Sequence, residues 1–216
     1  MKKKYIVFEN SLPELKLTST SIKEKGLCST TYIFEDISED EMLAFEKYYD
    51  YYIIGKDNLT LEKMIVNALF RLGYHVSCAE SCTGGAIISR IIGASGASEV
   101  VEESYVTYSE KAKSKLLDIP LSYIDKYGVV SEEVAESMAK GLKKKTNSEV
   151  CISVTGYAGR DDENFGENDG MCYFCIIVKD YIHLEKYQVK ASRNATRELF
   201  TTYILHQLLN ILKRLF

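Results

Sequence analysis

Hydroxyl groups and paired glycines gather in one short segment of the chain, residues 78–85, which reads Cys-Ala-Glu-Ser-Cys-Thr-Gly-Gly. The segment joins a predicted strand to an apolar, helix-like run. Glycines at such a turn let the backbone approach a ligand closely, and the first amides of a helix can bind an anion or a developing oxyanion. An ordinary turn with a helix N-cap has the same pattern. The candidate ligand-binding residues of this segment are Ser81, Thr83, Gly84 and Gly85.

A second candidate combines the hydroxyl of Ser98 with the amine of Lys113. Ser98 lies in a turn of small residues, and Lys113 follows the pair Tyr108-Ser109 by about one helical turn. A neutral lysine can activate a serine in place of histidine, provided that the lysine is partly desolvated. If Ser109 is an N-cap, the helix dipole and nearby Lys111 both disfavour the positive charge of Lys113. The alternative is an N-capping Ser98 and a solvated Lys113.

Two further candidates lie closer to the C-terminus. Thr155 and Gly156 end a predicted buried strand, so their hydroxyl and amide should face the crevice beyond the strand ends, where α/β proteins place ligands. Arg193, just before the last predicted helix, offers a guanidinium fork suited to a phosphate. A surface ion pair is an equally good interpretation of this arginine from the residues alone.

The cysteine and histidine patterns do not predict a metal centre. Cys172 and Cys175 have a zinc-like spacing, but they lie in a predicted strand, where side chains three positions apart point to opposite faces. The three histidines are scattered over a strand start, a strand and a helix, and the sequence contains neither a Walker A lysine nor a G-x-G-x-x-G motif. We therefore expect no metal and no cofactor.

The composition predicts a globular chain with one full domain. Of its 216 residues, 46% are hydrophobic, which suffices for a sizeable core. The net charge of -4 gives no basis for nucleic-acid binding, and no apolar run is long enough to span a membrane. Without a signal-peptide pattern, the six cysteines are expected to be free thiols of a cytoplasmic protein. A small-molecule partner is expected, and the broad apolar face of the last helix indicates core packing or a homo-oligomer interface.

Alternating helix and strand patterns from residue 60 onward predict an α/β fold. We expect three layers, α/β/α, around a mixed, mainly parallel sheet whose last two strands pair antiparallel across the turn Lys179-Asp180. Residues 1–56 should form a small N-terminal α+β extension, and residues 57–216 the main domain. Helices are expected near residues 61–72, 85–92, 99–103, 110–117, 132–145 and 195–215, and strands of the main domain near residues 75–79, 106–108, 150–154, 171–178 and 182–189.

Five segments occur in the order and spacing of one known family. They are residues 78–85, 96–98 (Gly-Ala-Ser), 106–113 (Val-Thr-Tyr-Ser-Glu-Lys-Ala-Lys), 128–131 (Gly-Val-Val-Ser) and 154–159 (Val-Thr-Gly-Tyr-Ala-Gly). From about Leu59 to Phe216 the chain resembles the C-terminal domain of the competence/damage-inducible protein CinA, a family that includes the stand-alone nicotinamide mononucleotide deamidase PncC. The preceding 55 residues are too few for the larger nucleotide-processing domain of full-length CinA proteins.

The resemblance implies an amidohydrolase that converts nicotinamide mononucleotide to nicotinate mononucleotide and ammonia. It implies Ser98 as the nucleophile and Lys113 as its base, with Tyr108 as a third catalytic residue. Ser81, Thr155 and Arg193 are implied to complete the site. No metal is required by this scheme.

The chain departs from the family pattern between Arg160 and Gly170. The family has prolines and additional glycines here, whereas this chain has five carboxylates in the same segment. An acidic lip should repel a phosphate-bearing substrate unless Arg160 and Arg193 offset it. Two alternatives therefore stay open: a catalytically impaired module that binds a nucleotide or a partner, and an amidohydrolase with a different, less anionic substrate.

Overall fold

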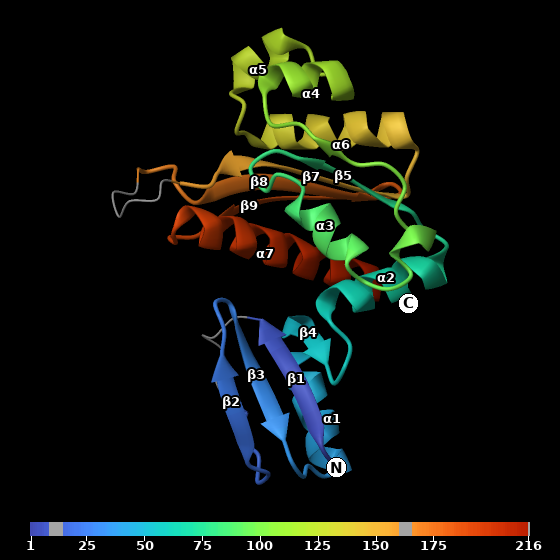
Figure 1. Ribbon diagram of the computed structural model, residues 1–216, viewed down its shortest axis with the longest axis vertical. Coiled ribbons are helices and arrows are strands. Elements are labelled where there is room, and N and C mark those ends of the chain that lie inside the picture. The colour runs from blue at the N-terminus through green and yellow to red at the C-terminus, as the bar shows by residue number, and fades with distance from the viewer. Residues whose placement is uncertain (9–14, 160–165, 216) are drawn as a thin grey trace.

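The chain folds around two separate β-sheets (Figure 1). This computed structural model describes residues 1–8, 15–159 and 166–215. The larger sheet has the strand order β6-β5-β7-β8-β9. Its strands are β5 (Val76–Glu80), β6 (Tyr105–Val106), β7 (Val150–Tyr157), β8 (Met171–Val178) and β9 (Tyr181–Gln188). Strand β5 pairs parallel with β6 and β7, whereas β8 pairs antiparallel with β7 and β9, so the sheet is mixed.

Helices cover both faces of this sheet, which confirms the predicted three-layer α/β fold (Figure 1). One face carries α4 (Glu110–Leu117), α5 (Leu121–Tyr127) and α6 (Glu132–Thr146). The other carries α2 (Leu61–Leu72), α3 (Ala86–Ile92) and α7 (Arg193–Lys213). Strand β5 is buried along its whole length, and β7 along all but its last two residues, because helices screen them on both sides.

Hydroxyl side chains fix the starts of three helices at the positions that their sequences indicate. Thr60, Ser109 and Ser131 each accept a hydrogen bond from the backbone amide three residues later, at 3.3, 3.1 and 3.2 Å. Such N-caps satisfy amides that have no partner inside the helix. The caps place α4 and α6 directly after the segments at residues 106–109 and 128–131 that resemble the family motifs.

The N-terminal residues form the predicted small α+β unit, in which one helix packs on an antiparallel sheet of order β2-β3-β1-β4. Its elements are β1 (Lys3–Phe8), β2 (Ser21–Lys25), β3 (Ser29–Phe34), α1 (Glu39–Tyr49), the 3₁₀ turn η1 (Asp50–Tyr52) and β4 (Ile53–Lys56). Ser38 caps α1, since its hydroxyl accepts from the amide of Glu41 and donates to the Glu41 carboxylate, both at 3.3 Å. The division of the chain at residue 56 stays a prediction.

Helix α7 is buried on nearly all sides because it lies between the larger sheet and the N-terminal unit (Figure 1). Polar groups on its outer face bond that unit: Gln207 accepts from the hydroxyl of Tyr51 at 3.0 Å, and Asn210 donates to the Tyr51 carbonyl at 3.1 Å. Phe8 packs against the ring of His206 with centroids 4.8 Å apart. The predicted apolar face of the last helix is therefore core.

One predicted helix is wrong. Residues 99–103 do not form a helix, since only a short 3₁₀ turn, η2 (Ala97–Glu99), lies here. The chain then runs beside β5, where the carbonyl of Val100 accepts from the amide of Val76 at 2.7 Å. A β-branched pair at residues 100 and 101 favours this extended pairing over a helix. Strand β2 and helix α5 were not among the predicted elements. Within the described residues, no helix has the length and apolarity that a membrane span needs.

Gly141 makes a testable contribution to this packing. It lies inside α6, where alanine ordinarily stabilises a helix, but a Cβ built on it would lie 2.3 Å from the carbonyl oxygen of Leu117 at the end of α4. We expect Gly141→Ala to lower the free energy of unfolding by about 1–3 kcal/mol. Urea unfolding measures this, and Lys144→Ala, at an exposed position of the same helix, should change it by less than about 0.5 kcal/mol. A stabilised Gly141→Ala variant would contradict the close approach of α4 and α6.

Candidate active site

A buried lysine and a buried serine lie in direct contact at the carboxyl end of β5. Lys113 is fully buried, and its Nζ donates to Ser81 Oγ at 3.0 Å and to the carbonyl oxygen of Thr107 at 2.8 Å. When the amine is neutral, its bond to Thr107 leaves the nitrogen lone pair for the Ser81 hydroxyl proton. The two side chains therefore have the geometry of a nucleophile and its general base.

Burial tunes the lysine for this task. Desolvation lowers the pKa of Lys113 from 10.5 to about 8, while the nearby Cys82 thiol and Glu110 carboxylate act in the opposite direction. The helix dipole and Lys111, which the sequence suggested as causes of a lowered pKa, are not needed to explain this shift. A lysine with this pKa is neutral in an appreciable fraction of molecules near pH 7 to 8, as a general base requires.

The parallel pairing of β5 and β7 positions Ser81 within a hollow. The amide of Ser81 donates to the carbonyl of Val154, so the turn after β5 starts beside the end of β7. A hollow of about 290 Å³ opens at this edge of the sheet. Its described lining is Ser81, Cys82, Tyr108, Val129, Val130, Thr155, Gly156, Tyr157, Ala158, Gly159, Asp169 and Arg193. Of the ten residues that the sequence suggested for the site, this lining brings together five: Ser81, Tyr108, Thr155, Gly156 and Arg193.

The suggested binding residues in the hollow have defined partners. Thr155 Oγ1 donates to the carbonyl of Val129 at 2.8 Å, and Arg193 Nη1 donates to the carbonyl of Gly159 at 2.8 Å, which leaves the rest of the guanidinium at the rim. Tyr108 is 62% exposed, so its ring can contact a ligand. Gly156 serves strand packing, because a Cβ there would lie 2.6 Å from the carbonyl oxygen of Met171.

The structure does not bring Ser98 to Lys113, which corrects the expected pairing. Ser98 is exposed and lines a different hollow, together with Ile92, Ala94, Gly96, Ala97 and Val101. Its turn lies at the start of the extended segment that runs along β5, before the chain reaches β6. The family resemblance pairs Lys113 with Ser98. In the folded chain, parallel pairing in the sheet instead brings Ser81, at the end of β5, against Lys113.

A buried carboxylate occupies the amides that the sequence suggested for anion binding. Glu80 is 1% exposed, and its two oxygens accept from the Thr83 hydroxyl at 2.7 Å and from the amides of Gly85, Ile87 and Ile88 at 3.0, 3.1 and 2.9 Å. The start of α3 is therefore not a ligand site. Thr83, Gly84 and Gly85 shape the turn, with Gly84 and Gly85 at φ angles of 64° and 95°.

Three residues that shape the site were not singled out from the sequence. They are Glu80, Thr107 and Arg197, whose guanidinium donates to the carbonyls of Cys82 and Thr83. An acidic residue just before a helix start matches the positive end of the helix dipole, and this was a usable signal for Glu80. Arg197 lies four positions after Arg193 on α7, which places both on one helix face. Thr107 bonds Lys113 through its backbone carbonyl, so its side-chain type carried no information about this contact.

The cysteines near the hollow are not reactive groups. Burial raises the pKa of the Cys82 thiol to about 12, so the thiol stays protonated at neutral pH. Cys172 and Cys175 pack into the cores on opposite faces of the sheet, as strand alternation predicts, and they do not share a site.

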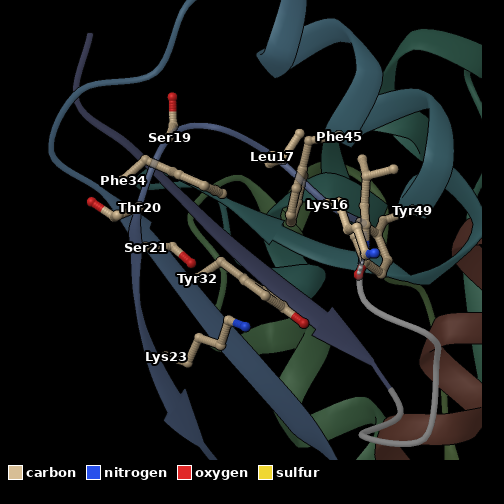
Figure 2. A pocket seen from close by; sticks show the side chains of 11 residues that line it. Lys16, Leu17, Ser19, Thr20, Ser21, Lys23, Tyr32, Phe34, Phe45 and Tyr49 are labelled. Carbon is tan, nitrogen blue, oxygen red and sulfur yellow. Dashed lines mark hydrogen bonds between the residues drawn. The ribbon is translucent and has the colours of Figure 1, made fainter.

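A second hollow, of about 470 Å³, lies in the N-terminal unit (Figure 2). Figure 2 shows aromatic side chains of β3 and α1, including Tyr32, Phe34 and Phe45, with Lys16 and several hydroxyls from the segment before β2. Tyr49 Oη accepts from the amide of Leu15 at 3.2 Å and so holds one side of this segment. The described lining contains no paired nucleophile and base, so the chemistry of the chain points to the hollow at Ser81.

Comparison with known proteins identifies the larger part of the chain. Residues 58–212 match the family model of the CinA C-terminal domain. A protein of Alkaliphilus oremlandii, described as competence-damage inducible, is 38% identical over 153 residues, or 71% of this chain and 37% of that protein. One of Limosilactobacillus reuteri is 36% identical over 220 residues, or 95% of this chain and 52% of that protein. This chain thus spans about half the length, or less, of these relatives.

Solved structures have the same fold. The crystal structure of a CinA superfamily protein from Escherichia coli, 27% identical in sequence, matches with a TM-score of 0.65 over 70% of this chain and 90% of that one.

Proposed function

Because this chain belongs to the CinA C-terminal domain family, we propose that it is an amidohydrolase with Ser81 as nucleophile and Lys113 as general base. The observation that carries the proposal is the contact between the buried Lys113 amine, whose pKa is lowered, and the Ser81 hydroxyl. The substrate that we propose is nicotinamide mononucleotide, and the products are nicotinate mononucleotide and ammonia.

The reaction proceeds in two halves. Neutral Lys113 takes the proton of Ser81 Oγ while the oxygen attacks the carboxamide carbon, and the lysine then returns that proton to the leaving nitrogen as ammonia departs. A water molecule adds to the resulting acyl-serine after giving a proton to Lys113. The carboxylate product leaves as that proton returns to Ser81 Oγ.

The oxyanion of each tetrahedral intermediate needs donors other than the first amides of α3, since Glu80 binds those. The amide of Cys82 belongs to the residue after the nucleophile, which lines the same hollow, and we assign it to this role. Once Lys113 has accepted the proton, its ammonium adds a positive charge next to Ser81 that also stabilises the oxyanion.

The carboxylate of Asp169, which lines the hollow, should weaken binding of a phosphate. Asp169 and Arg193 both line the hollow, whereas Asp161 and Asp162, part of the expected acidic lip, lie outside the described residues. We expect Asp169→Asn to lower KM for nicotinamide mononucleotide about two- to fivefold at low salt, because a negative charge is removed near the phosphate. Asn retains an acceptor for the amide of Gly166, which Asp169 now bonds at 2.8 Å.

A matched control comes from the opposite end of the sheet. Asp180 lies in the exposed turn between β8 and β9, so Asp180→Asn changes the net charge equally but should leave KM unaltered. Equal effects of the two variants, or no effect of Asp169→Asn, would show that the phosphate does not bind at this rim.

An ammonia-release assay over nicotinamide mononucleotide, its nucleoside and free nicotinamide tests the proposed substrate. Deamidation of the mononucleotide alone supports it. Preference for an uncharged amide would favour the less anionic substrate that the acidic segment suggests, and binding of the mononucleotide without ammonia release would favour a binding module. We assign to this chain none of the activities of the longer relatives' other domains. That the chain forms a homo-oligomer stays a prediction.

A further inference from the structure

Groups of opposite charge hold the turn that carries Ser81 from two sides. On one side, the Glu80 carboxylate accepts four hydrogen bonds from the turn and the first residues of α3. These bonds fix the amide groups of the turn. A carboxylate that accepts several backbone amides is a strong and directional anchor.

On the other side, the guanidinium of Arg197 fixes the carbonyl groups. Arg197 Nε donates to the carbonyl of Cys82 at 3.1 Å, and its Nη2 donates to the carbonyl of Thr83 at 2.9 Å. Gly84 leaves room for this approach, since a Cβ there would lie 3.3 Å from Arg197 Nη2. The two successive carbonyls are thus held by one planar fork.

The bonds of Arg197 set the second and third peptide planes after the nucleophile, those between residues 82 and 83 and between residues 83 and 84. The carbonyl of Cys82 belongs to the peptide between residues 82 and 83, so its direction restrains the backbone that places the Ser81 hydroxyl against Lys113. A displacement of about 1 Å at a reacting group can cost about 100-fold in rate. Arg197 itself is not part of the described lining of the hollow, in contrast to Arg193 one helical turn earlier.

We propose that Arg197, together with Glu80, is a positioning residue that keeps Ser81 aligned with Lys113 and makes no contact with substrate. This inference rests on the proposed role of Ser81. It predicts different kinetic effects for two arginines on the same helix. Loss of Arg197 should lower kcat and leave KM nearly unchanged, whereas loss of Arg193 should raise KM for a phosphate-bearing substrate.

The test compares Arg197→Ala, Arg197→Lys and Arg193→Ala with the wild-type chain. We expect kcat to fall about 30- to 100-fold in Arg197→Ala, with KM within about twofold, and about tenfold in Arg197→Lys, which has no fork. Guanidinium at about 20 mM, far below denaturing concentrations, should restore part of the rate of Arg197→Ala and none of that of Arg193→Ala. Arg71→Ala, at an exposed position of α2, should behave like wild type.

A second readout does not depend on the substrate. A fluorophosphonate reacts with an activated serine hydroxyl by displacing fluoride, and intact mass measures the rate of labelling. We expect wild-type labelling that Ser81→Ala abolishes and Arg197→Ala slows at least tenfold, with guanidinium rescue demonstrating a folded variant. Such labelling without deamidation of nicotinamide mononucleotide would support the positioning role and overturn only the substrate.

Three results would overturn the inference. If Arg197→Ala is labelled as fast as wild type, Ser81 is a nucleophile that does not need Arg197. If wild-type Ser81 is not labelled, the assignment of the nucleophile fails, and the positioning role fails with it. An Arg197→Ala variant that loses activity through KM alone would instead place Arg197 in contact with substrate.

Discussion

Ser81→Ala should lower the turnover of amide hydrolysis at least about 1,000-fold, whereas Ser98→Ala should keep it within about twofold. The reason is geometric, because Ser81 Oγ lies 3.0 Å from the amine of Lys113 and Ser98 lines another hollow. Ammonia release under saturating substrate measures both variants. Thermal unfolding serves as the control for folding.

The two variants are matched, because each one removes a single serine hydroxyl from the same chain. The Ser81 variant also removes a hydrogen bond of a buried amine, so a modest change of stability, about 1 kcal/mol, is expected for it alone. Full activity of Ser81→Ala with an inactive Ser98→Ala would restore the pairing that the family resemblance implied.

Lys113→Met should abolish activity and at the same time stabilise the fold at pH 7. A pKa lowered from 10.5 to about 8 means that the charged lysine costs the folded state about 3 kcal/mol relative to the unfolded chain. Methionine fills a similar volume without this cost but loses the bonds to Ser81 and Thr107. We expect a net gain of about 1–3 kcal/mol in the free energy of unfolding.

The gain should depend on pH in a defined direction. Well below pH 8 the lysine is charged in both states, so the cost is present in full. Between about pH 8 and 10.5 the folded state has released the proton and the unfolded state still holds it, so wild-type stability rises with pH. The advantage of Lys113→Met should therefore shrink between pH 7.5 and pH 10, as urea unfolding at the two values can measure.

The same pKa governs the rate. In the wild-type chain, kcat/KM should rise about tenfold per pH unit below about pH 8 and level off above it, since only the neutral amine accepts the serine proton. Lys113→Arg should be inactive throughout, because a guanidinium stays protonated. Lys111→Arg, at an exposed position on the same helix, should retain the wild-type profile. An active Lys113→Arg variant would remove Lys113 from the base role.

Local sequence patterns were enough to predict most helices and strands of the larger part of the chain. The starts of α2, α4 and α6 follow from hydroxyl N-caps, and the antiparallel pair β8 and β9 follows from two apolar segments around a two-residue polar turn. These features depend on neighbours within a few residues. The helix expected at residues 99–103 was wrong because pairing with β5, a contact distant in sequence, decides its conformation.

The sequence by itself also determined which chemical groups are available: the hydroxyl of Ser81, the amine of Lys113 and the guanidinium of Arg193 were all candidates. Only the tertiary structure decided which serine meets the lysine. Parallel pairing of β5 with β6 brings the end of β5 beside the start of α4, so that residues 32 positions apart share a hydrogen bond. Burial at that junction then lowers the pKa of Lys113, and no local pattern contains this information, since desolvation arises from every element packed around the amine.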